Sequence, residues 1–468
     1  MKFQILSSVM LGMTLTACSL TPQLTMPVAP IPKHYPAVNL GDQRAGIVPL
    51  DWTNVFTDPY LQQLIPQALE NNRDLRLATL DVAVVQAQYG IQRSTMLPAI
   101  DVAISETRQR SNSSGTGATV SAQKNISLGI SAYEIDLFSR ASSMTDAAFA
   151  RFLSSEYGRN SAQISLVSAI ADAYHAVLLA RDQLQLAKQT LKDWQQSLNL
   201  ARQLKEAKQN SGLDVAQAEG QVAIAEADCE SRTRALALAH HALQLLVGKE
   251  LTREMDSAPK LEQLPRPFFP TGLPSDLLTN RPDILQAEQN LRAANADIGA
   301  ARAAFFPRLS LTTSVGYGSS EMHNLFDRDN RSWIFAPQIT IPIFSAGRLR
   351  AELRLSELRK SIAVVEYERA IQIAFREVSD GLVGRETFTR QFAAQQRVVD
   401  NAAKRLELST LRYRAGVDSR LEVLDAQRQL YAAQQALLDL RGAELSNAVS
   451  LYKALGGGAV PSLRSQLE

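Results

Sequence analysis

The sequence predicts a chain of mixed α and β structure that is built from an internal tandem repeat. Three observations support this prediction. Short motifs recur in the same order about 208 residues apart, alternating apolar and polar residues stand at one point in each copy, and long proline-free runs follow them. Alternation with a period of two is typical of strands, whereas proline interrupts helices. Each copy should therefore contain a helix, two strands, a long helix and a final helix.

The repeat is visible in matched motifs. "NNRDLRLATL" (71–80) matches "TNRPDILQAEQ" (279–289), and "LLVGKE" (245–250) matches "KALGGG" (453–458). The stretch "NSGLDVAQAE" (210–219) is a diverged copy of part of "RAGVDSRLEVLDAQR" (414–428). These matches divide the chain into a first repeat at 58–248, a proline-rich linker at 249–279, a second repeat at 280–456 and a C-terminal tail at 457–468.

Strands are predicted in two hairpins, at about 97–138 and about 306–344. In the first hairpin, Ile100, Val102 and Ile104 alternate with small or polar residues, and the second hairpin alternates in part. Pro337 and Pro342 would be unfavourable in a central strand of a soluble sheet. Each segment has about twelve residues, close to the roughly 9–11 residues with which a tilted strand crosses an outer membrane.

Four strands per chain are too few for a membrane barrel. Known transmembrane barrels begin at about eight strands, and an open sheet edge is not stable in lipid. Strands that lie in a membrane would therefore have to be pooled by two, three or more copies of the chain. The residues alone do not choose among these numbers.

Long helices are predicted at about 139–209 and about 346–414, where no proline occurs. At about 1.5 Å per residue, seventy helical residues form a rod of roughly 100 Å. Heptad spacing of apolar residues indicates coiled-coil packing. Turns follow at about 210–214 and about 415–419, and further helices at about 213–248 and about 420–456. We expect Gly212 and Gly416 to permit the chain reversals.

The N-terminus is typical of an exported protein. Residues 1–17 form a short signal peptide, and Leu15-Thr16-Ala17-Cys18 resembles the lipobox in which the cysteine receives lipid, including palmitate. An ordinary signal with an incidental Cys18 is the alternative. If Cys18 receives lipid, residues 18–57 form a lipid-anchored N-terminal segment. Cys229 is the remaining cysteine, so no intrachain disulfide is expected.

Composition and motifs exclude several functions. A net charge of +2 without a basic cluster gives no sign of a nucleic-acid partner. No metal-ligand spacing, nucleotide-binding loop or catalytic motif is present in the sequence, so we expect no metal, no catalytic residue and no cofactor other than the lipid on Cys18. The sequence therefore favours a protein that is not an enzyme.

Four motifs carry a resemblance to a known family: "NRPDILQAEQNLRAANADIGAARAAFFPRLSL" (280–311), "IPIFSAGR" (341–348), "LEVLDAQR" (421–428) and "LYKALGGG" (451–458). On these residues the chain resembles the TolC-like outer membrane factors of bacterial tripartite efflux systems, in their lipid-anchored branch. The resemblance implies a homotrimer with one twelve-stranded transmembrane β-barrel. A long periplasmic α-helical barrel would continue it, banded in an equatorial region by the N-terminal segment, the linker and the C-terminus.

The resemblance also implies partners and a task. The chain would be the outer membrane exit channel for drugs or other small molecules, with a role in antibiotic resistance. It would work with a periplasmic adaptor protein and an inner-membrane pump of the resistance-nodulation-division type, which supplies the energy. A lipid-anchored periplasmic coiled-coil spacer without a pore is the alternative function.

Carried over by position, the resemblance places a periplasmic gate at the second turn. Leu421 would form an apolar constriction and Asp425 an acidic ring, while Arg428 and Tyr413 would tie neighbouring helices; Glu422 matches less consistently. A solvated pair on a helix surface is the alternative for Asp425 and Arg428. The resemblance implies adaptor contacts at the two turns, at Gly212, Leu213, Gly416 and Val417.

Overall fold

The computed structural model describes residues 19–32, 51–113, 117–251, 258–265 and 280–458. Cys18 and most of the 249–279 linker therefore lie outside the described residues. The chain divides into two compact units. One contains residues 81–156 and 286–368 together with the N-terminus to Val28, and the other contains 29–80, 157–285 and 369–468.

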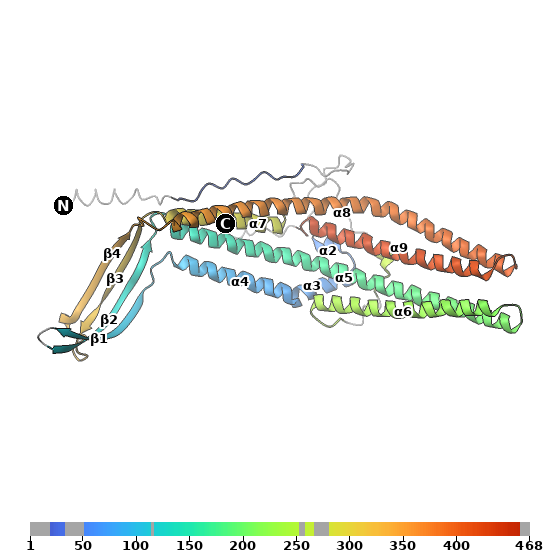
Figure 1. The fold of residues 1–468 in the computed structure, drawn as a ribbon, viewed down its shortest axis with the longest axis horizontal. Helices are drawn as coiled ribbons and strands as arrows, with labels where there is room; N and C mark the ends of the chain where they lie inside the picture. The colour runs from blue at the N-terminus through green and yellow to red at the C-terminus, as the bar shows by residue number, and fades with distance from the viewer. Residues whose placement is uncertain (1–18, 33–50, 114–116, 252–257, 266–279, 459–468) are drawn as a thin grey trace. The chain divides into compact units, whose positions relative to one another are not determined.

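The two repeats have matching helices (Figure 1). Helices α4 (Arg73–Ser94) and α7 (Pro282–Ala303) have 22 residues each, and α5 (Arg140–Glu206) and α8 (Arg348–Arg414) have 67 each. Helix α6 (Gly212–Val247) has 36 residues and α9 (Arg420–Ala454) has 35. Partner helices begin 208 or 209 positions apart, so the duplication extends to the structure of each helix.

Short elements complete the helical part. Helices α2 (Trp52–Val55) and α3 (Pro59–Asn71) precede α4. The 3-10 helix η2 (Leu261–Gln263) lies in the described part of the linker, and η4 (Arg328–Asn330) precedes the last strand.

Four strands form one antiparallel sheet in the order β1-β2-β3-β4. They are β1 (Asp101–Ser113), β2 (Gly117–Ile135), β3 (Arg308–Ser319) and β4 (Arg331–Thr340). The expectation of about twelve residues per strand is wrong for β2, which has 19. The reason is that β2 pairs with two staggered neighbours, with β1 through residues 117–129 and with β3 through 124–135.

The sheet has two chemically different faces. One row of paired residues across the four strands is apolar and exposed: Val102, Leu128, Val315 and Trp333. The next row is small or polar: Ala103, Ser127, Gly316 and Ser332. Successive residues of a strand point to opposite faces, so these rows lie on opposite sides of the sheet.

Glycines on the small, polar face allow close backbone approach. A Cβ atom on Gly316 would lie 2.1 Å from the Ile126 carbonyl oxygen, and one on Gly129 would lie 2.4 Å from the Thr313 carbonyl oxygen. Since no side chain fits at such distances, both positions require glycine. A face that lacks side chains at these points can curve inward.

The helix ends of the two repeats are capped in parallel ways. Asn72 donates from Nδ2 to the Leu246 carbonyl oxygen at 2.8 Å, near the end of α6. Its counterpart 209 positions later, Arg281, donates from Nη1 to the Ala454 carbonyl oxygen at 2.7 Å, at the end of α9. Gly248 and Gly456 follow these helices with positive φ, as helix C-termini favour. The "NRPD" motif thus satisfies carbonyl groups that a helix end leaves unpaired.

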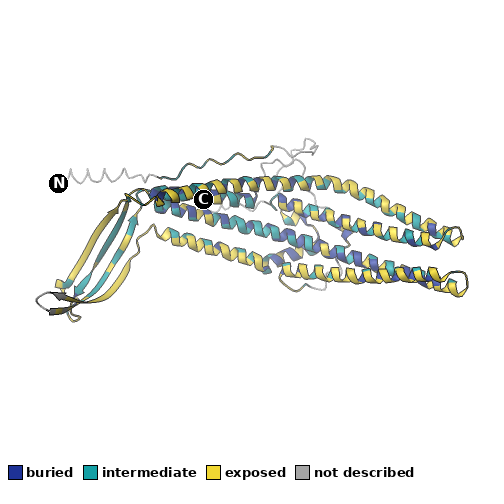
Figure 2. Ribbon diagram, in the orientation of Figure 1, coloured by how far each residue is buried: buried dark blue, intermediate teal, exposed yellow. Residues whose placement is uncertain are grey.

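Buried residues concentrate where α3 meets the long helices (Figure 2). Tyr174 of α5 is fully buried, and its Oη donates to Asp58 Oδ1 at 3.0 Å. Asp58 also caps α3 by accepting from the backbone of Leu61 at 2.9 Å. Burial, followed by the Asp58 carboxylate, raises the pKa of Tyr174 above its ordinary value, so this hydroxyl stays protonated.

The described linker residues are held against the helices by hydrogen bonds. Arg181 of α5 donates to the Ala258 carbonyl oxygen at 2.8 Å, and Asp182 accepts from the Leu261 backbone at 2.8 Å. Arg441 of α9 donates to the Leu264 carbonyl oxygen at 2.6 Å.

Among the described helices, α5 alone has a window apolar and long enough to cross a membrane, but 56% of that window is buried within the protein. That apolar window therefore belongs to the packed core.

Candidate functional site

Two chain reversals lie at equivalent places of the repeats. The first tip (residues 204–215) joins α5 to α6, and the second tip (residues 412–423) joins α8 to α9. In the first, the Gln209 N–H donates to the Leu204 carbonyl oxygen at 2.8 Å; in the second, the Val417 N–H donates to the Arg412 carbonyl oxygen at 3.0 Å. This bond spans six residues and is the Schellman pattern of helix ends.

The residue that reverses the chain differs from the expectation in the first tip. Gly416 has a φ of 73° as predicted, but in the first tip Lys208 has positive φ, at 59°. Gly212 is the first residue of α6, and its counterpart 208 positions later is Arg420. The role assigned to Gly212 is therefore wrong, because the end of the preceding helix decides which residue adopts the left-handed conformation. The turn lies at 207–211, earlier than the expected 210–214, since α5 ends at Glu206.

The two helices that follow begin in different ways. In the first tip, Ser211 Oγ accepts from the Asp214 backbone at 3.2 Å, and the Asp214 carboxylate accepts from the Ser211 backbone at 3.2 Å. These reciprocal bonds form a capping box. In the second tip, Ser419 caps nothing through its side chain. Glu422, the counterpart of Asp214, instead has its carboxylate 3.4 Å from Arg405.

Apolar packing supports the first tip. Trp194, Leu198 and Ala201 of α5 form a buried cluster with residues of α6: Val215, Ala218, Val222 and Ala225. The spacing of three and four residues on both helices is that of a coiled-coil seam. Burial of these apolar side chains stabilises the helix pair, because packing contributes most of the stability of helices in proteins.

A charged cluster lies beside the second tip. Asp425 of α9 accepts from Arg405 of α8 at 3.0 Å and from Arg428 at 2.9 Å. Gln429 donates to the same carboxylate at 3.0 Å, and its side-chain oxygen accepts from Arg405. We call Arg405, Glu422, Asp425, Arg428 and Gln429 the tip cluster. Because two guanidinium groups face two carboxylates, the cluster is neutral overall and ties α8 to α9.

Two further arginines fix the second tip. Arg412 donates to the Asp418 carboxylate from Nε at 2.6 Å and from Nη2 at 2.8 Å, and this interaction lowers the pKa of the Asp418 carboxyl. Arg420 is buried, and it donates from Nη2 to the Ser197 carbonyl oxygen at 2.6 Å and to Ser197 Oγ at 2.7 Å. Arg420 thus links α9 of the second repeat to α5 of the first.

The structure brings some of the expected gate residues together. Glu422, Asp425 and Arg428 lie in the tip cluster, while Leu421 is 56% exposed at the start of α9. Arg428 is bonded within its own helix, and the Tyr413 hydroxyl has no hydrogen-bond partner among the described residues of this chain. Leu213 and Val417, expected to contact an adaptor, are exposed apolar side chains at the tips.

Sequence reasoning missed Arg405, Gln429, Arg412, Asp418 and the bond of Arg420 to α5. A signal was available for two ion pairs. Arg405 and Asp425 lie equally far before and after Ala415 in the sequence, and so do Arg412 and Asp418. Residues at equal distances from a helix reversal face each other across an antiparallel pair.

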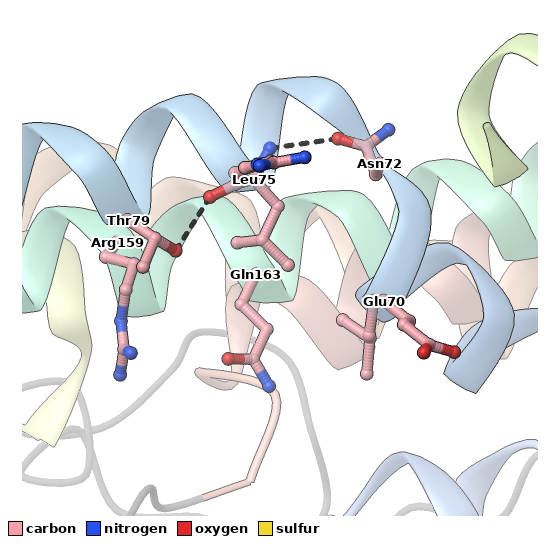
Figure 3. A pocket seen from close by; sticks show the side chains of 8 residues that line it. Glu70, Asn72, Leu75, Thr79, Arg159 and Gln163 are labelled. Carbon is pink, nitrogen blue, oxygen red and sulfur yellow. Dashed lines mark hydrogen bonds between the residues drawn. The ribbon is translucent and has the colours of Figure 1, made fainter.

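One open pocket lies in the first repeat, where α3 and α4 face α5 (Figure 3). It has a volume of about 340 Å³ and lies between α4 and α5, lined by Leu69, Glu70, Asn72, Leu75, Arg76, Thr79, Arg159 and Gln163. The second-repeat counterparts of Leu75, Arg159 and Gln163 are Ile284, Tyr367 and Ile371, which are buried. Two of these three positions, Arg159 and Gln163, are thus more polar in the first repeat than in the second. Within the described ranges, no three His, Cys, Asp or Glu side chains gather as a metal site requires.

Comparison with known proteins gives consistent matches. The model of the family "Outer membrane efflux protein" matches residues 64–249 and 273–457, two segments that begin 209 positions apart. The antibiotic efflux pump outer membrane protein ArpC of Pseudomonas putida is 43% identical over 465 residues, covering 98% of this chain and 96% of the relative. Outer membrane protein OprJ of Pseudomonas aeruginosa is 41% identical, covering 97% and 95%. The open-state MtrE outer membrane channel of Neisseria gonorrhoeae superposes with a TM-score of 0.85 at 35% identity, covering 94% and 99%.

Proposed function

This chain belongs to the outer membrane efflux protein family, and from this premise we propose how it forms and closes an exit channel. It is an outer membrane efflux channel of the TolC fold and not an enzyme. Its place in a tripartite efflux pump implies that energy comes from another component. The proposal concerns the number of copies, the gate, the adaptor contacts, the lipid anchor and the cargo.

The two-faced sheet carries the proposal of a shared barrel. Its exposed apolar row, which includes Val102 and Trp333, suits contact with lipid, and the opposite row of small and polar residues suits a water-filled interior. Strands β1 and β4 are the outer strands of the sheet. An outer strand in lipid needs a partner, so sister copies must supply it. Three copies would close a twelve-stranded barrel, as the resemblance implies.

The gate proposal rests on the second tip. Exposed Leu421 would narrow the channel, and Asp425 one turn later would form an acidic ring around the channel axis. Three carboxylates on one axis repel each other and attract cations. Arg405 and Arg428 offset this repulsion because both contact Asp425. Glu422 contributes through Arg405, and Tyr413 stays available for a helix of a neighbouring copy.

The partners follow from the same arrangement. Leu213 and Val417, which are exposed apolar residues beside Gly212 and Gly416, would contact a periplasmic adaptor protein, and a pump of the resistance-nodulation-division type in the inner membrane would supply the driving force. Lipid on Cys18 would anchor the chain in the outer membrane. The segment that follows Cys18 lies on α7, where Asn295 donates to the Pro22 carbonyl oxygen at 2.8 Å. Labelled palmitate incorporation that is lost in Cys18→Ala tests the anchor.

Channel formation is tested by conductance. The purified chain in planar bilayers should conduct as an oligomer that runs as a larger species on gels before heating. A coiled-coil spacer without a pore would conduct nothing.

The gate is tested by the double substitution Asp425→Ala with Arg428→Ala, which should increase current and antibiotic sensitivity. Unchanged current in the double variant would contradict the gate at these residues.

Cargo is proposed from the relatives. ArpC, which is 43% identical, is named for antibiotic efflux, so we expect small antibiotics to leave through this channel. A deletion strain should become more sensitive to several antibiotics and recover when the gene is returned. Sensitivity to metal ions alone would contradict this cargo class.

A further inference from the structure

The apolar face of the sheet changes character at its outer end, where β1 connects to β2 and β3 to β4. Every second residue of a strand lies on the same face, so the rows that follow Val102 are given by the strand pairing. The first of these rows is mostly apolar or aromatic: Ile104, Ile126, Tyr317 and Arg331. The later rows hold the remaining charged residues of this face: Glu106, Lys124, Arg108 and Arg110. We call Lys124, Arg108, Arg110 and Arg331 the outer cations.

The opposite face of the sheet differs in charge. In the outer half of the sheet its described residues are uncharged: Ser105, Thr107, Gln109, Ser121, Gln123, Asn125, Gly316, Gly318 and Ser332. The inner end of the apolar face is also different, because its described paired residues are apolar or aromatic: Tyr133, Ile135, Leu309, Leu311, Pro337 and Ile339. The outer cations are therefore confined to one face of the sheet and to one end of that face.

The length of the apolar part places the outer cations at a membrane surface. On β3 it extends from Leu309 to Tyr317, eight positions and about 27 Å along the strand. At a tilt of about 40° this spans about 20 Å of the membrane, comparable with the apolar band of about 25 Å in such barrels. Trp333 and Tyr317 lie in its last two rows, where aromatic residues are typical. Arg331 shares the row of Tyr317, and Lys124 lies in the next row, at the depth of lipid headgroups.

Little of this positive charge is neutralised within the chain. Glu106 accepts from Arg108 Nε at 2.7 Å, and it lies opposite Lys124 in the strand pairing. Arg110 and Arg331 form no ion pair with another described residue of the chain. The β3–β4 connection contains acids that are not paired with an outer cation in the described structure: Glu321, Asp327 and Asp329. Four cations and one carboxylate leave a net charge of +3 on this surface.

We propose that the outer cations bind phosphate groups of lipopolysaccharide in the outer leaflet of the outer membrane. This inference rests on the proposed shared barrel, which places the apolar face against lipid, and it adds the lipid that contacts the outer end of that face. Arginine binds phosphate through two parallel hydrogen bonds, and lysine binds it as a point charge. Lipopolysaccharide carries phosphate on the sugars that hold its acyl chains, so its phosphates lie where the apolar face ends.

The confinement of the cations to one end favours lipopolysaccharide over phospholipid. Phospholipid phosphates form the inner surface of the outer membrane, and there they meet the inner end of the apolar face. The described residues of that end, such as Leu309 and Ile339, offer no charge to a phosphate. A surface that merely tolerated headgroups would not need its cations at the outer end alone.

Lipid binding by the purified full-length oligomer tests the proposal. By native mass spectrometry in detergent, the wild type should bind bisphosphorylated lipid A several-fold more tightly than dephosphorylated lipid A or phosphatidylglycerol. Arg108→Gln with Arg110→Gln should weaken lipid A binding about tenfold or more, and Lys124→Gln about fivefold, because each cation near a charged lipid surface contributes roughly equally. Lipid A should also raise the temperature at which the wild-type oligomer dissociates on gels, and should raise it less in the double variant.

Arg348→Gln with Arg350→Gln is the matched control. It removes two exposed arginines of the same spacing at the start of α8, and Arg348 binds Glu352 at 2.7 Å just as Arg108 binds Glu106. This variant should bind lipid A as tightly as the wild type. Both double variants should conduct as the wild type does, which shows that they fold and assemble.

Three results would overturn the lipid site while leaving the channel intact. They are unchanged lipid A affinity in Arg108→Gln with Arg110→Gln, an equal loss in the control, and wild type that binds phosphatidylglycerol as tightly as lipid A. A monomeric, non-conducting wild type would overturn the proposed function itself.

Discussion

In the first tip, Lys208 has the positive φ that reverses the chain, and Ser211 and Asp214 cap the second helix. In the second tip, Gly416 has the positive φ, and the Ser419 side chain forms no capping hydrogen bond. Both have the same Schellman bond at the end of the incoming helix. In the first tip, the carboxylate at the helix start, that of Asp214, accepts a hydrogen bond from the Ser211 backbone. In the second, the equivalent Glu422 faces Arg405 instead.

This difference teaches that the duplication preserved the backbone path while the side chains diverged. Local capping and apolar packing hold the first tip, together with the Arg202–Glu219 ion pair. The second tip is held by ion pairs of partly exposed groups, and such pairs are weak individually and sensitive to pH, salt and neighbouring charges. A structure held in that way can open and close more readily. This supports the second tip as the moving part of the channel.

The largest effect is expected at Arg420, which stands where the first tip has Gly212. Arg420→Ala removes two hydrogen bonds to Ser197 and should cost about 1–3 kcal/mol of stability at the start of α9, because bonds to charged groups contribute that much. Hydrogen exchange in the second tip should increase and should change little in the first tip. Arg420→Lys should recover part of the protection. Unchanged exchange in Arg420→Ala would show that the link to α5 is unimportant.

A second test compares the two cross-helix ion pairs. Arg405→Ala leaves Asp425 and Glu422 without their partner on α8, so single-channel current should rise several-fold. Arg202→Ala breaks the Arg202–Glu219 pair at 2.8 Å between the helices of the first tip and is the control. Because the side chains of these three ion pairs are 32–54% exposed, neither substitution should cost more than about 1 kcal/mol of folding stability. Equal currents in the two variants would remove the distinction between the tips.

The caps provide a matched pair of smaller effects. Ser211→Ala breaks the capping box and should destabilise the first tip by about 1 kcal/mol. Ser419→Ala at the equivalent position should have almost no effect, because that side chain caps nothing. Limited proteolysis at each tip measures both. A larger effect from Ser419→Ala would mean that the second tip has the same cap as the first.

Substitutions at the two residues with positive φ, Gly416 and Lys208, should change the stability of their tips in opposite directions. Gly416→Ala forces a β-carbon into positive φ and should cost about 1 kcal/mol, while Lys208→Gly should relieve a similar strain and gain up to about 1 kcal/mol. The protease resistance of each tip reports the change. Gain of stability in Gly416→Ala would contradict the observed backbone conformation.

The smallest effect is a pH dependence confined to the second tip. Arg412 lowers the pKa of Asp418, so the ionised pair stabilises the tip at neutral pH and the contribution is lost as pH falls below about 4, through the lowered pKa. The protection factors of residues 412–418, which correct hydrogen exchange for the intrinsic amide rate at each pH, should fall in that range, and Asp418→Asn should abolish this fall. If the protection factors of Asp418→Asn still fall with pH, the pH dependence belongs to another group.

Much of the fold was predictable because its signals are local. The period-two alternation around Val102 and Val315 and the proline-free runs of α5 and α8 identify strands and helices without reference to distant residues. Asp425 and Arg428 were selected through their motif; they form an ion pair, and their role in a gate stays a prediction. The Gly212 role and the length of β2 were wrong, because a left-handed residue and a strand's length depend on hydrogen bonds with other segments.

By itself the sequence determined the duplication, the order of helices and strands, and the membership of this chain in its family, because each depends on residue patterns that the chain contains in full. Only the tertiary structure decided that Arg405 meets Asp425 and that Arg420 reaches Ser197. The physical reason is that contact and burial are properties of segments brought together by packing. The type of a residue determines which groups it can bind, and its neighbours in the folded chain determine which of them it binds.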